Sequence, residues 1–180
     1  NGLQADLKQF NTVMPVFARE KQWKKGDTLI QKDLANTLKR IRDNGEAGFY
    51  EGETARLIVE EMKRGKGIIS AEDLKNYRAK LREPHVFPYK DYKIIGMPMP
   101  CSGGILLHQM MSMTRDKNIS HMGFQSPQSV QLMIEAERRA YADRAEHMGD
   151  ADFYKVPVNM LVDEVYLQKR MENYDSSKAT

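Results

Sequence analysis

The apolar residues of this chain repeat at helical spacing along most of its length, and that period is broken in one region. Apolar positions three and four residues apart make stripes that stop at glycines or polar turns, as in the surface helices of globular proteins. Helices are predicted over residues 28–43, 53–64, 71–77, 105–113, 127–148 and 164–173. The chain is therefore expected to be rich in helix.

Local start signals support four of these helices. Ser126 is followed by a proline, which combines a capping hydroxyl with the residue favoured at the first helical position. Ser70 and Asp73 have the spacing of a capping box, in which each side chain accepts a hydrogen bond from the other residue's backbone amide. Asp27 and Asp163 are expected to cap the first and the last helix.

The helical period is broken between residues 78 and 97, where the apolar residues suit two extended runs about a turn. Pro84 and Pro88 lack amide donors, so the first strand is expected at a sheet edge or at a bulge. Helices with about two strands give a helix-rich α+β fold. Residues 1–25 have no steady period and are predicted to be an irregular lead-in to a domain over 26–180.

The composition is that of a globular protein, and it excludes several classes of partner and site. Of the 180 residues, 41% are hydrophobic and 29% are charged, which lies outside the range of disordered chains. The net charge of +3 comes from 28 basic and 25 acidic residues without a long block of one sign, so nucleic acid is not an expected partner. Apolar runs are far shorter than the roughly 20 residues of a membrane-spanning helix. A single cysteine, Cys101, excludes a disulfide within the chain and a multi-cysteine metal site.

Ser102, Gly103 and Gly104 lie where a strand is expected to pass into a helix. Glycines let backbone amides approach an anion, and a helix start carries partial positive charge, so these residues could cradle an anion. The lysine of a phosphate-binding loop and the spacing of a dinucleotide fingerprint are both absent from the sequence. A tight turn that requires glycine is the favoured interpretation.

The histidines and the cysteine form no recognisable catalytic or metal-binding pattern. His85, His108, His121 and His147 include no pair at the four-residue spacing of a helical metal site, so zinc is not expected. Cys101 and His108 could act as nucleophile and base, but no carboxylate is identified that would orient the histidine. A small thiol that is buried or half-buried is the favoured interpretation of Cys101.

Acidic and basic residues are concentrated in the helix predicted over 127–148. They are Glu135, Glu137, Arg138, Arg139, Asp143, Arg144 and Glu146, with Asp150 and Asp152 after the helix. Paired carboxylates can transfer protons, which would be a catalytic role. Several of these acids, however, have a basic residue three or four positions away, which is typical of a solvated or interdomain helix face. We favour that structural role for the cluster.

Five segments resemble the γ-glutamyltranspeptidase family in their order and spacing. They are residues 26–31 with 34–35, 49–52, 69–74, 92–104, and 135–144 with 149–153. The most family-specific blocks are Met-Pro-x-Pro-x-Ser-Gly-Gly at 97–104 and Tyr-Ala-Asp-Arg at 141–144. Two departures are mild. Residues 98–102 read Pro-Met-Pro-Cys-Ser where Pro-Pro-Pro-Ser-Ser is common, and residues 150–153 read Asp-Ala-Asp-Phe where Asp-Pro-Asp-Phe is common.

The resemblance implies an N-terminal-nucleophile hydrolase, an αββα sandwich whose precursor cleaves itself into a large and a small subunit. In that family the threonine freed at the start of the small subunit attacks the γ-glutamyl carbonyl, and its own amine can serve as base. The glutamyl group then passes to water or to an acceptor amine, without metal or cofactor. This chain resembles the C-terminal half of the large subunit, and we expect it to stop short of the self-cleavage site. Thr180 is therefore not expected to be the nucleophile.

The resemblance places the substrate-binding arginine upstream of this segment and the oxyanion-hole glycines in the small subunit. We therefore expect no catalytic, substrate-binding or metal-binding residue in this chain, and no activity from the chain alone. The first residues contain neither an initiator methionine nor a basic and then apolar leader, which also indicates a piece of a longer chain.

The expected partners are the N-terminal part of the large subunit and the small subunit, with a glutathione-like substrate in the full protein and no cofactor, nucleic acid or membrane. Bacterial relatives are commonly exported, so a periplasmic or extracellular location is expected from the resemblance. The alternatives are a fragment of a related acylase or capsule depolymerase of the same fold, and a helical interaction module without enzymatic activity.

Overall fold

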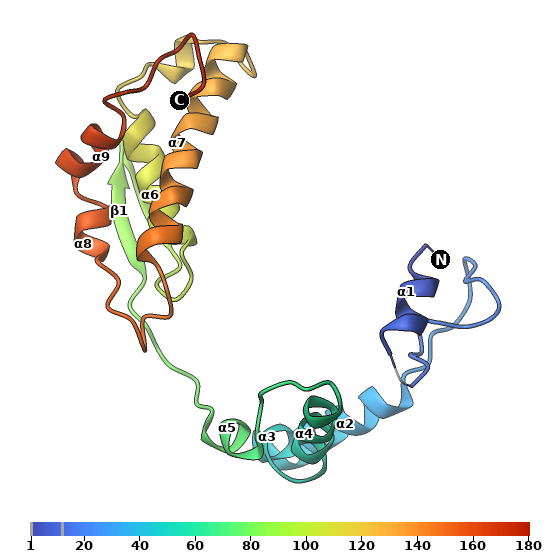
Figure 1. Cartoon of the computed structure of the whole chain (residues 1–180). Coiled ribbons are helices and arrows are strands. Elements are labelled where there is room, and N and C mark those ends of the chain that lie inside the picture. Colours follow the sequence, from blue (N-terminus) through green and yellow to red (C-terminus); the bar gives the residue numbers. More distant parts are fainter. Residues whose placement is uncertain (1, 12) are drawn as a thin grey trace. The chain divides into compact units, whose positions relative to one another are not determined.

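A computed structural model describes residues 2–11 and 13–180 of the chain. The fold divides into two compact units, Asn1–Ala79 and Lys80–Thr180, which are treated separately below (Figure 1). Whether residues 26–180 belong to one domain of a larger protein stays a prediction. No helix of the described residues is long and apolar enough to cross a bilayer.

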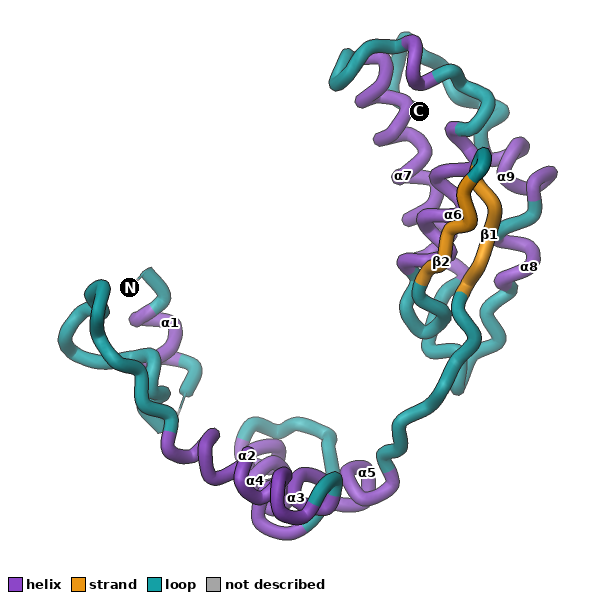
Figure 2. Tube along the Cα trace, turned by 180° about the vertical axis from the view of Figure 1, so that it is seen from behind, coloured by secondary structure: helices purple, strands orange, loops and turns teal. Residues whose placement is uncertain are grey.

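The described part of the first unit is helical. It contains α1 (Gln4–Gln9), α2 (Lys32–Asn44), α3 (Ala47–Tyr50), α4 (Gly52–Arg64) and α5 (Ala71–Asn76) (Figures 1 and 2). The predictions for α4 and for the capping box of α5 are confirmed: Asp73 N donates to the Ser70 hydroxyl, and Ser70 N donates to the Asp73 carboxylate at 2.8 Å. The short helix α1 lies in the lead-in that was expected to be irregular.

The predicted start of α2 is wrong by four residues. The carboxylate of Asp27 accepts from the Lys24 amide at 2.8 Å and pairs with Arg19, so it caps no helix. Leu29 and Ile30 precede the helix, which begins at Lys32 without a side-chain cap. The spacing of apolar residues therefore predicted the helix correctly. Asp27, which was expected to cap it, instead belongs to a turn that precedes the helix.

Gly48 allows α2 and α3 to approach closely. A Cβ atom at this position would lie 2.1 Å from the carbonyl oxygen of Arg40, a distance that no side chain can occupy. The Thr54 hydroxyl donates to the Gly48 carbonyl at 2.8 Å and accepts from Arg40 Nε at 3.0 Å. These bonds tie α2, α3 and α4 together around a glycine.

The second unit is built around one helix, α6. Its elements are β1 (His85–Tyr89), β2 (Tyr92–Gly96), α6 (Gly103–Thr114), the 3₁₀ turn η1 (Ile119–His121), α7 (Pro127–His147), α8 (Val158–Leu161) and α9 (Glu164–Arg170). Helix α6 contacts the β1–β2 hairpin, α7, α8 and α9, and Figure 1 shows the hairpin and α7 on different sides of it.

Burial within α6 explains its central place. One cluster of the apolar core joins α6, α7 and α9 through Leu106, Met113, Leu132, Ala136, Ala140, Leu167 and Met171. A smaller cluster joins Ile105 to Met99 and Leu161. Ile105 and Leu106, which are consecutive in α6, thus belong to different clusters, so other elements pack against this helix on more than one face.

The predicted hairpin is confirmed. β1 and β2 pair antiparallel in a continuous register, with Phe87 opposite Ile94 and Pro88 opposite Lys93. Pro88 therefore lies in an edge strand and not at a bulge. Ser126 caps α7 and Asp163 caps α9 as predicted, but α9 ends at Arg170, three residues earlier than expected.

Candidate functional site

A row of polar side chains follows one face of α7 at four-residue spacing. It consists of Gln131, Glu135, Arg139 and Asp143, and we call it the polar ridge. Glu135 is 1% exposed, Asp143 2% and Arg139 8%. Of the two expected alternatives, a solvated or an interdomain helix face, the solvated one is therefore wrong for these three residues, although Glu137, Arg138, Arg144 and Glu146 are exposed.

The position of the ridge follows from helix geometry. Residues 132, 136 and 140 form the buried apolar face of α7. Residues 131, 135 and 139 each precede one of them in the sequence, so they lie along the side of that face. The pattern was visible in the sequence, since Glu135 and Arg139 adjoin Ala136 and Ala140 at each turn. The expected pairs three and four residues apart do form, between Glu135 and both Arg138 and Arg139, but placing them on a solvated face overlooked their burial.

Glu135 is the most enclosed charge of the ridge. Its Oε1 accepts from Arg138 Nη1 at 2.9 Å and from the backbone amide of Thr180 at 3.2 Å. Its Oε2 accepts from Arg139 Nη1 and from the Thr180 hydroxyl. The Thr180 hydroxyl first, and the Arg139 guanidinium second, lower the pKa of Glu135 to about 2, so its carboxylate is ionised at neutral pH.

Arg139 connects α7 to α9 and to the last residues of the chain. Its Nε donates to the carbonyl of Arg170 at 2.7 Å. Its Nη2 donates to Asn173 Oδ1 at 2.8 Å and to the Thr180 hydroxyl at 2.9 Å. A buried guanidinium is tolerated because it pairs with Glu135 and these donors have acceptors.

Asp143 makes a second polar junction one turn further along. Tyr166 OH donates to its Oδ1 at 2.9 Å, Gln109 Nε2 donates to its Oδ2 at 2.9 Å, and Arg170 Nη2 lies 3.0 Å from Oδ1. Burial first, and the bond to Asp143 second, raise the pKa of Tyr166 to about 12. The junction therefore holds α6, α7 and α9 together around a neutral phenol, with both carboxylate oxygens of Asp143 engaged by partners.

The turn before α6 is a structural turn. A Cβ atom on Gly104 would lie 2.4 Å from the Met97 carbonyl oxygen, so the start of α6 packs directly on the backbone after β2. The Ser102 hydroxyl accepts from Arg144 Nε at 3.0 Å. The close approach at Gly104 agrees with a turn that requires glycine there, whereas a Cβ atom on Gly103 would make only an ordinary contact of 3.6 Å with Cys101 Sγ. Cys101 is exposed, so the prediction of a buried or half-buried thiol is wrong, because the turn directs it away from the core.

Two histidines that are far apart in the sequence meet between β1 and α6. Nε2 of His85 lies 3.0 Å from Nδ1 of His108, and the His108 ring stacks on Phe87 with centroids 4.0 Å apart. Burial first, and the neighbouring His85 second, lower the pKa of His108 to about 4. Sequence spacing could not reveal this pair, because it depends on how the hairpin packs on α6. Among the described residues, no group of three or more possible ligands could hold a metal ion.

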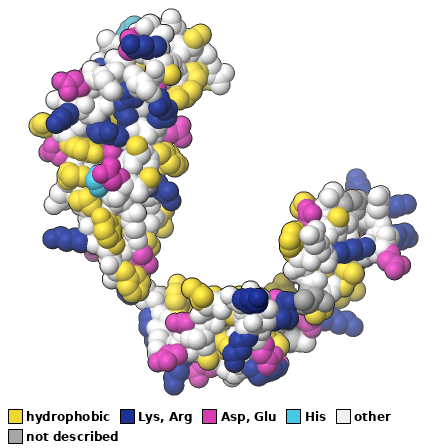
Figure 3. Space-filling view, in the orientation of Figure 1, with side chains coloured by type: hydrophobic (Ala, Val, Ile, Leu, Met, Phe, Trp, Pro, Cys, Tyr) yellow, Lys and Arg dark blue, Asp and Glu magenta, His cyan; other side chains and the backbone are white. Residues whose placement is uncertain are grey.

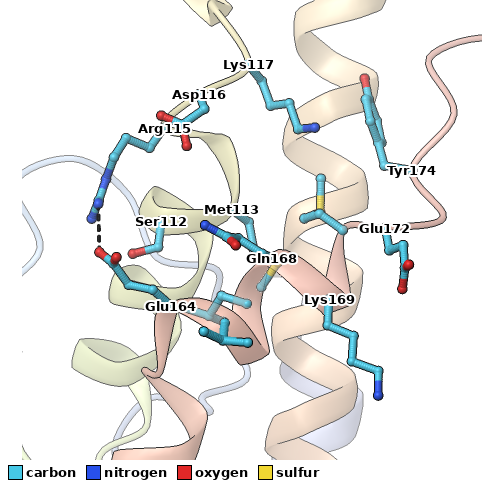
Figure 4. Close-up of a pocket in the computed structure, with 13 residues that line it drawn as sticks. Ser112, Met113, Arg115, Asp116, Lys117, Glu164, Gln168, Lys169, Glu172 and Tyr174 are labelled. Carbon is cyan, nitrogen blue, oxygen red and sulfur yellow. Dashed lines mark hydrogen bonds and ion pairs between the residues drawn. The ribbon is translucent and has the colours of Figure 1, made fainter.

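A depression of about 800 Å³ lies beside the C-terminal end of α6 and α9 (Figure 4). Figure 4 shows charges of both signs around it, with Arg115 bonded to Glu164 at 2.9 Å. Lys117 Nζ lies 5.6 Å from the centroid of the Tyr174 ring. The lining has as many carboxylates as cations, so the depression shows no concentrated positive charge that would favour an anionic ligand. The carboxylates are those of Asp116, Glu164 and Glu172, and the cations are those of Arg115, Lys117 and Lys169.

Comparison with known proteins gives the family. Residues 2–180 match the family model described as gamma-glutamyltranspeptidase. The glutathione hydrolase proenzyme of Escherichia coli (strain K12) is 39% identical over 188 residues, which cover 99% of this chain and 32% of that protein. The acylase ACY 1 proenzyme of Pseudomonas sp. (strain V22) is 41% identical over 145 residues, which cover 81% of this chain and 26% of that protein.

The same likeness is seen in three dimensions. The crystal structure of Helicobacter pylori gamma-glutamyltranspeptidase is similar to this structure with a TM-score of 0.89 and 37% identity, over 99% of this chain and 52% of that chain. The chain spans about a third of the length of the E. coli relative. The chain belongs to the γ-glutamyltranspeptidase family.

Proposed function

We propose that this chain is part of a proenzyme that hydrolyses γ-glutamyl amides such as glutathione, or transfers their γ-glutamyl group to an acceptor amine. The likeness to the H. pylori enzyme over 99% of the chain is the observation that carries this proposal. The names of the relatives support it, since the E. coli protein is a glutathione hydrolase proenzyme.

Within such a protein we assign this chain the role of scaffold. The buried carboxylates described above are fully engaged: Glu135 has four donors, and Asp143 has three partners. Groups committed in this way stabilise a fold and offer no free base or nucleophile to a substrate. We place the nucleophilic threonine and the substrate-binding groups in other parts of the parent protein, which include a second subunit released from the proenzyme.

Turnover of a chromogenic γ-glutamyl anilide tests the proposal. The complete parent protein is expected to release the coloured amine and to transfer the γ-glutamyl group to added glycylglycine. The chain of residues 1–180 alone is expected to show no turnover. A complete parent without activity toward any γ-glutamyl amide would refute the proposal, and saturable turnover by the repurified 1–180 chain would refute the scaffold role.

A related acylase is the second candidate, and the 41% identity to the acylase ACY 1 proenzyme is the observation that favours it. An acylase would cleave amides of a different acyl group. The two candidates separate when the parent protein is offered γ-glutamyl and glutaryl anilides side by side, because the glutaryl group lacks the α-amine of glutamate.

We also propose a periplasmic or extracellular location for the parent protein, which rests on the resemblance to exported bacterial relatives. Fractionation of cells that express the parent gene tests it directly. Recovery of the mature protein with cytoplasmic markers would contradict this location.

A further inference from the structure

The last residues of the chain lie along α7 without regular secondary structure, and ridge side chains hold them there. We call residues 173–180 the C-terminal segment; its end lies beside α7 in Figures 1 and 2. Gln131 Nε2 donates to the carbonyls of Asp175 at 2.7 Å and of Lys178 at 2.9 Å. Side chains of the segment are held as well: Arg139 Nη2 donates to Asn173 Oδ1 at 2.8 Å, and Tyr174 OH donates to Gln131 Oε1 at 3.1 Å. The ridge therefore fixes the path of the segment through both its backbone and its side chains.

Residue 180 is held more specifically than its neighbours. The Glu135 carboxylate accepts both the backbone amide and the hydroxyl of Thr180, and Arg139 Nη2 donates to the same hydroxyl at 2.9 Å. A hydroxyl that donates to one charged group and accepts from another has a fixed rotamer. Main chain and side chain of this residue are therefore both specified by buried charges.

We infer that Glu135 and Thr180 are positioning residues for the cleavage that converts the parent proenzyme into two subunits, an inference that rests on the proposed function. When residue 180 is held in place, the part of the parent chain that follows it starts from a fixed point and in a fixed direction. That part then samples fewer conformations before the bond to be cleaved reaches the geometry that cleavage requires. Cleavage is a net hydrolysis: the peptide C–N bond breaks, the oxygen of water joins the carbonyl carbon as carboxylate, and the new amine takes up the protons. Glu135 and Thr180 touch none of these atoms and act through the path of the chain.

The two residues differ in what they contribute to the fold, which makes a clean test possible. Glu135 is buried, and its loss would leave Arg139 as a buried cation without a counter-charge, which can destabilise the unit. Thr180 is exposed as a residue and contributes to neither apolar cluster. Thr180→Val keeps the branched shape and removes only the hydroxyl, so this variant decides the question even where Glu135→Gln fails to fold.

The experiment follows the precursor of the complete parent protein on denaturing gels after a pulse of synthesis. Thr180→Val and Glu135→Gln are expected to slow the splitting of the precursor about tenfold, since each loses hydrogen bonds to charged groups. Thr180→Ser restores the hydroxyl and is expected to mature at the wild-type rate. Glu137→Gln, on the exposed face of the same helix, is the matched control and is expected to leave the rate unchanged.

A second measurement separates positioning from general stability. Loss of the Thr180 hydroxyl removes two hydrogen bonds to buried charges, so the melting temperature of Thr180→Val is expected to fall somewhat. Once matured, the Thr180→Val protein is nevertheless expected to have wild-type kcat and KM, because residue 180 contributes only to maturation. Maturation of Thr180→Val at the wild-type rate would overturn the inference, as would a Thr180→Ser protein that is as slow as Thr180→Val. A wild-type parent that is neither split nor active would instead refute the proposed function, and the inference with it.

Discussion

The contact between His85 and His108 makes the stability of residues 80–180 depend on pH. In the folded chain the pKa of His108 is lowered to about 4 from an ordinary value of 6.5, and burial also lowers the pKa of His85. Between these two pH values the unfolded chain binds more protons than the folded chain. The free energy of unfolding is therefore expected to fall as pH drops from 6.5 toward 4, and to change little through His108 outside that window.

The size of this effect follows from the pKa of His108. A full difference between 6.5 and about 4 corresponds to at most about 3 kcal/mol. The ring is partly exposed, and the charges of Arg115 and Glu164 act on it with opposite sign, so we expect about 1–2 kcal/mol after solvent screening. The two rings share one hydrogen bond and titrate as a pair, so the loss belongs to the pair and not to one residue.

Urea unfolding of the 1–180 chain at a series of pH values measures this loss, with hydrogen exchange at the amides of α6 to localise it. His108→Phe preserves a ring for stacking on Phe87 and removes the proton site, so this variant is expected to lose about 1–2 kcal/mol less than the wild type over the same window. His121→Gln, which changes an exposed histidine, is the control and should follow the wild type. Equal losses for the wild type and for His108→Phe would refute the reasoning.

Other expected outcomes concern packing and exposure. Gly104→Ala puts a Cβ atom against the Met97 carbonyl oxygen and is expected to cost about 1–3 kcal/mol of stability, measured by urea unfolding; a variant as stable as wild type would contradict the close approach. Leu132→Ala removes a fully buried side chain and is expected to cost about 2–5 kcal/mol, against less than about 0.5 kcal/mol for the exposed Met133→Ala on the same helix. Cys101 is expected to react with a thiol reagent in the native chain as fast as in urea, and slow native labelling would show that the turn is covered. The 1–180 chain is expected to self-associate, because many large apolar side chains are exposed (Figure 3); light scattering from a monomer over a wide concentration range would count against this.

The elements that were predicted correctly are formed by interactions between residues that are close together in the sequence. Ser126 before a proline, the Ser70–Asp73 capping box and the Asp163 cap each act through hydrogen bonds across one helical turn. The hairpin could likewise be located from its extended pattern and its turn. Where the prediction failed at the start of α2, the competing interaction was also local: Asp27 closes a turn with Lys24.

The candidate site was harder to predict, because its residues acquire their roles from distant partners. The sequence shows Glu135 as one member of a charge pair on a helix surface, but in the folded chain Thr180, which lies 45 residues away, also binds its carboxylate. His85 and His108 are 23 residues apart and meet only when the hairpin packs on α6. Neither contact can be predicted from the spacing of residues within a single helix or strand.

The amino-acid sequence by itself located the longer helices to within a few residues, the hairpin, the turn before α6 and the family, because these depend on short-range hydrogen bonding, side-chain period and motif order. It did not reveal the short helices α1, α3 and α8. The tertiary structure decided which charges are buried, where the thiol points and what holds residue 180. Burial and ion pairing depend on surfaces brought together by folding, and the free energy of a charge is set by the groups that surround it and not by its neighbours in the chain.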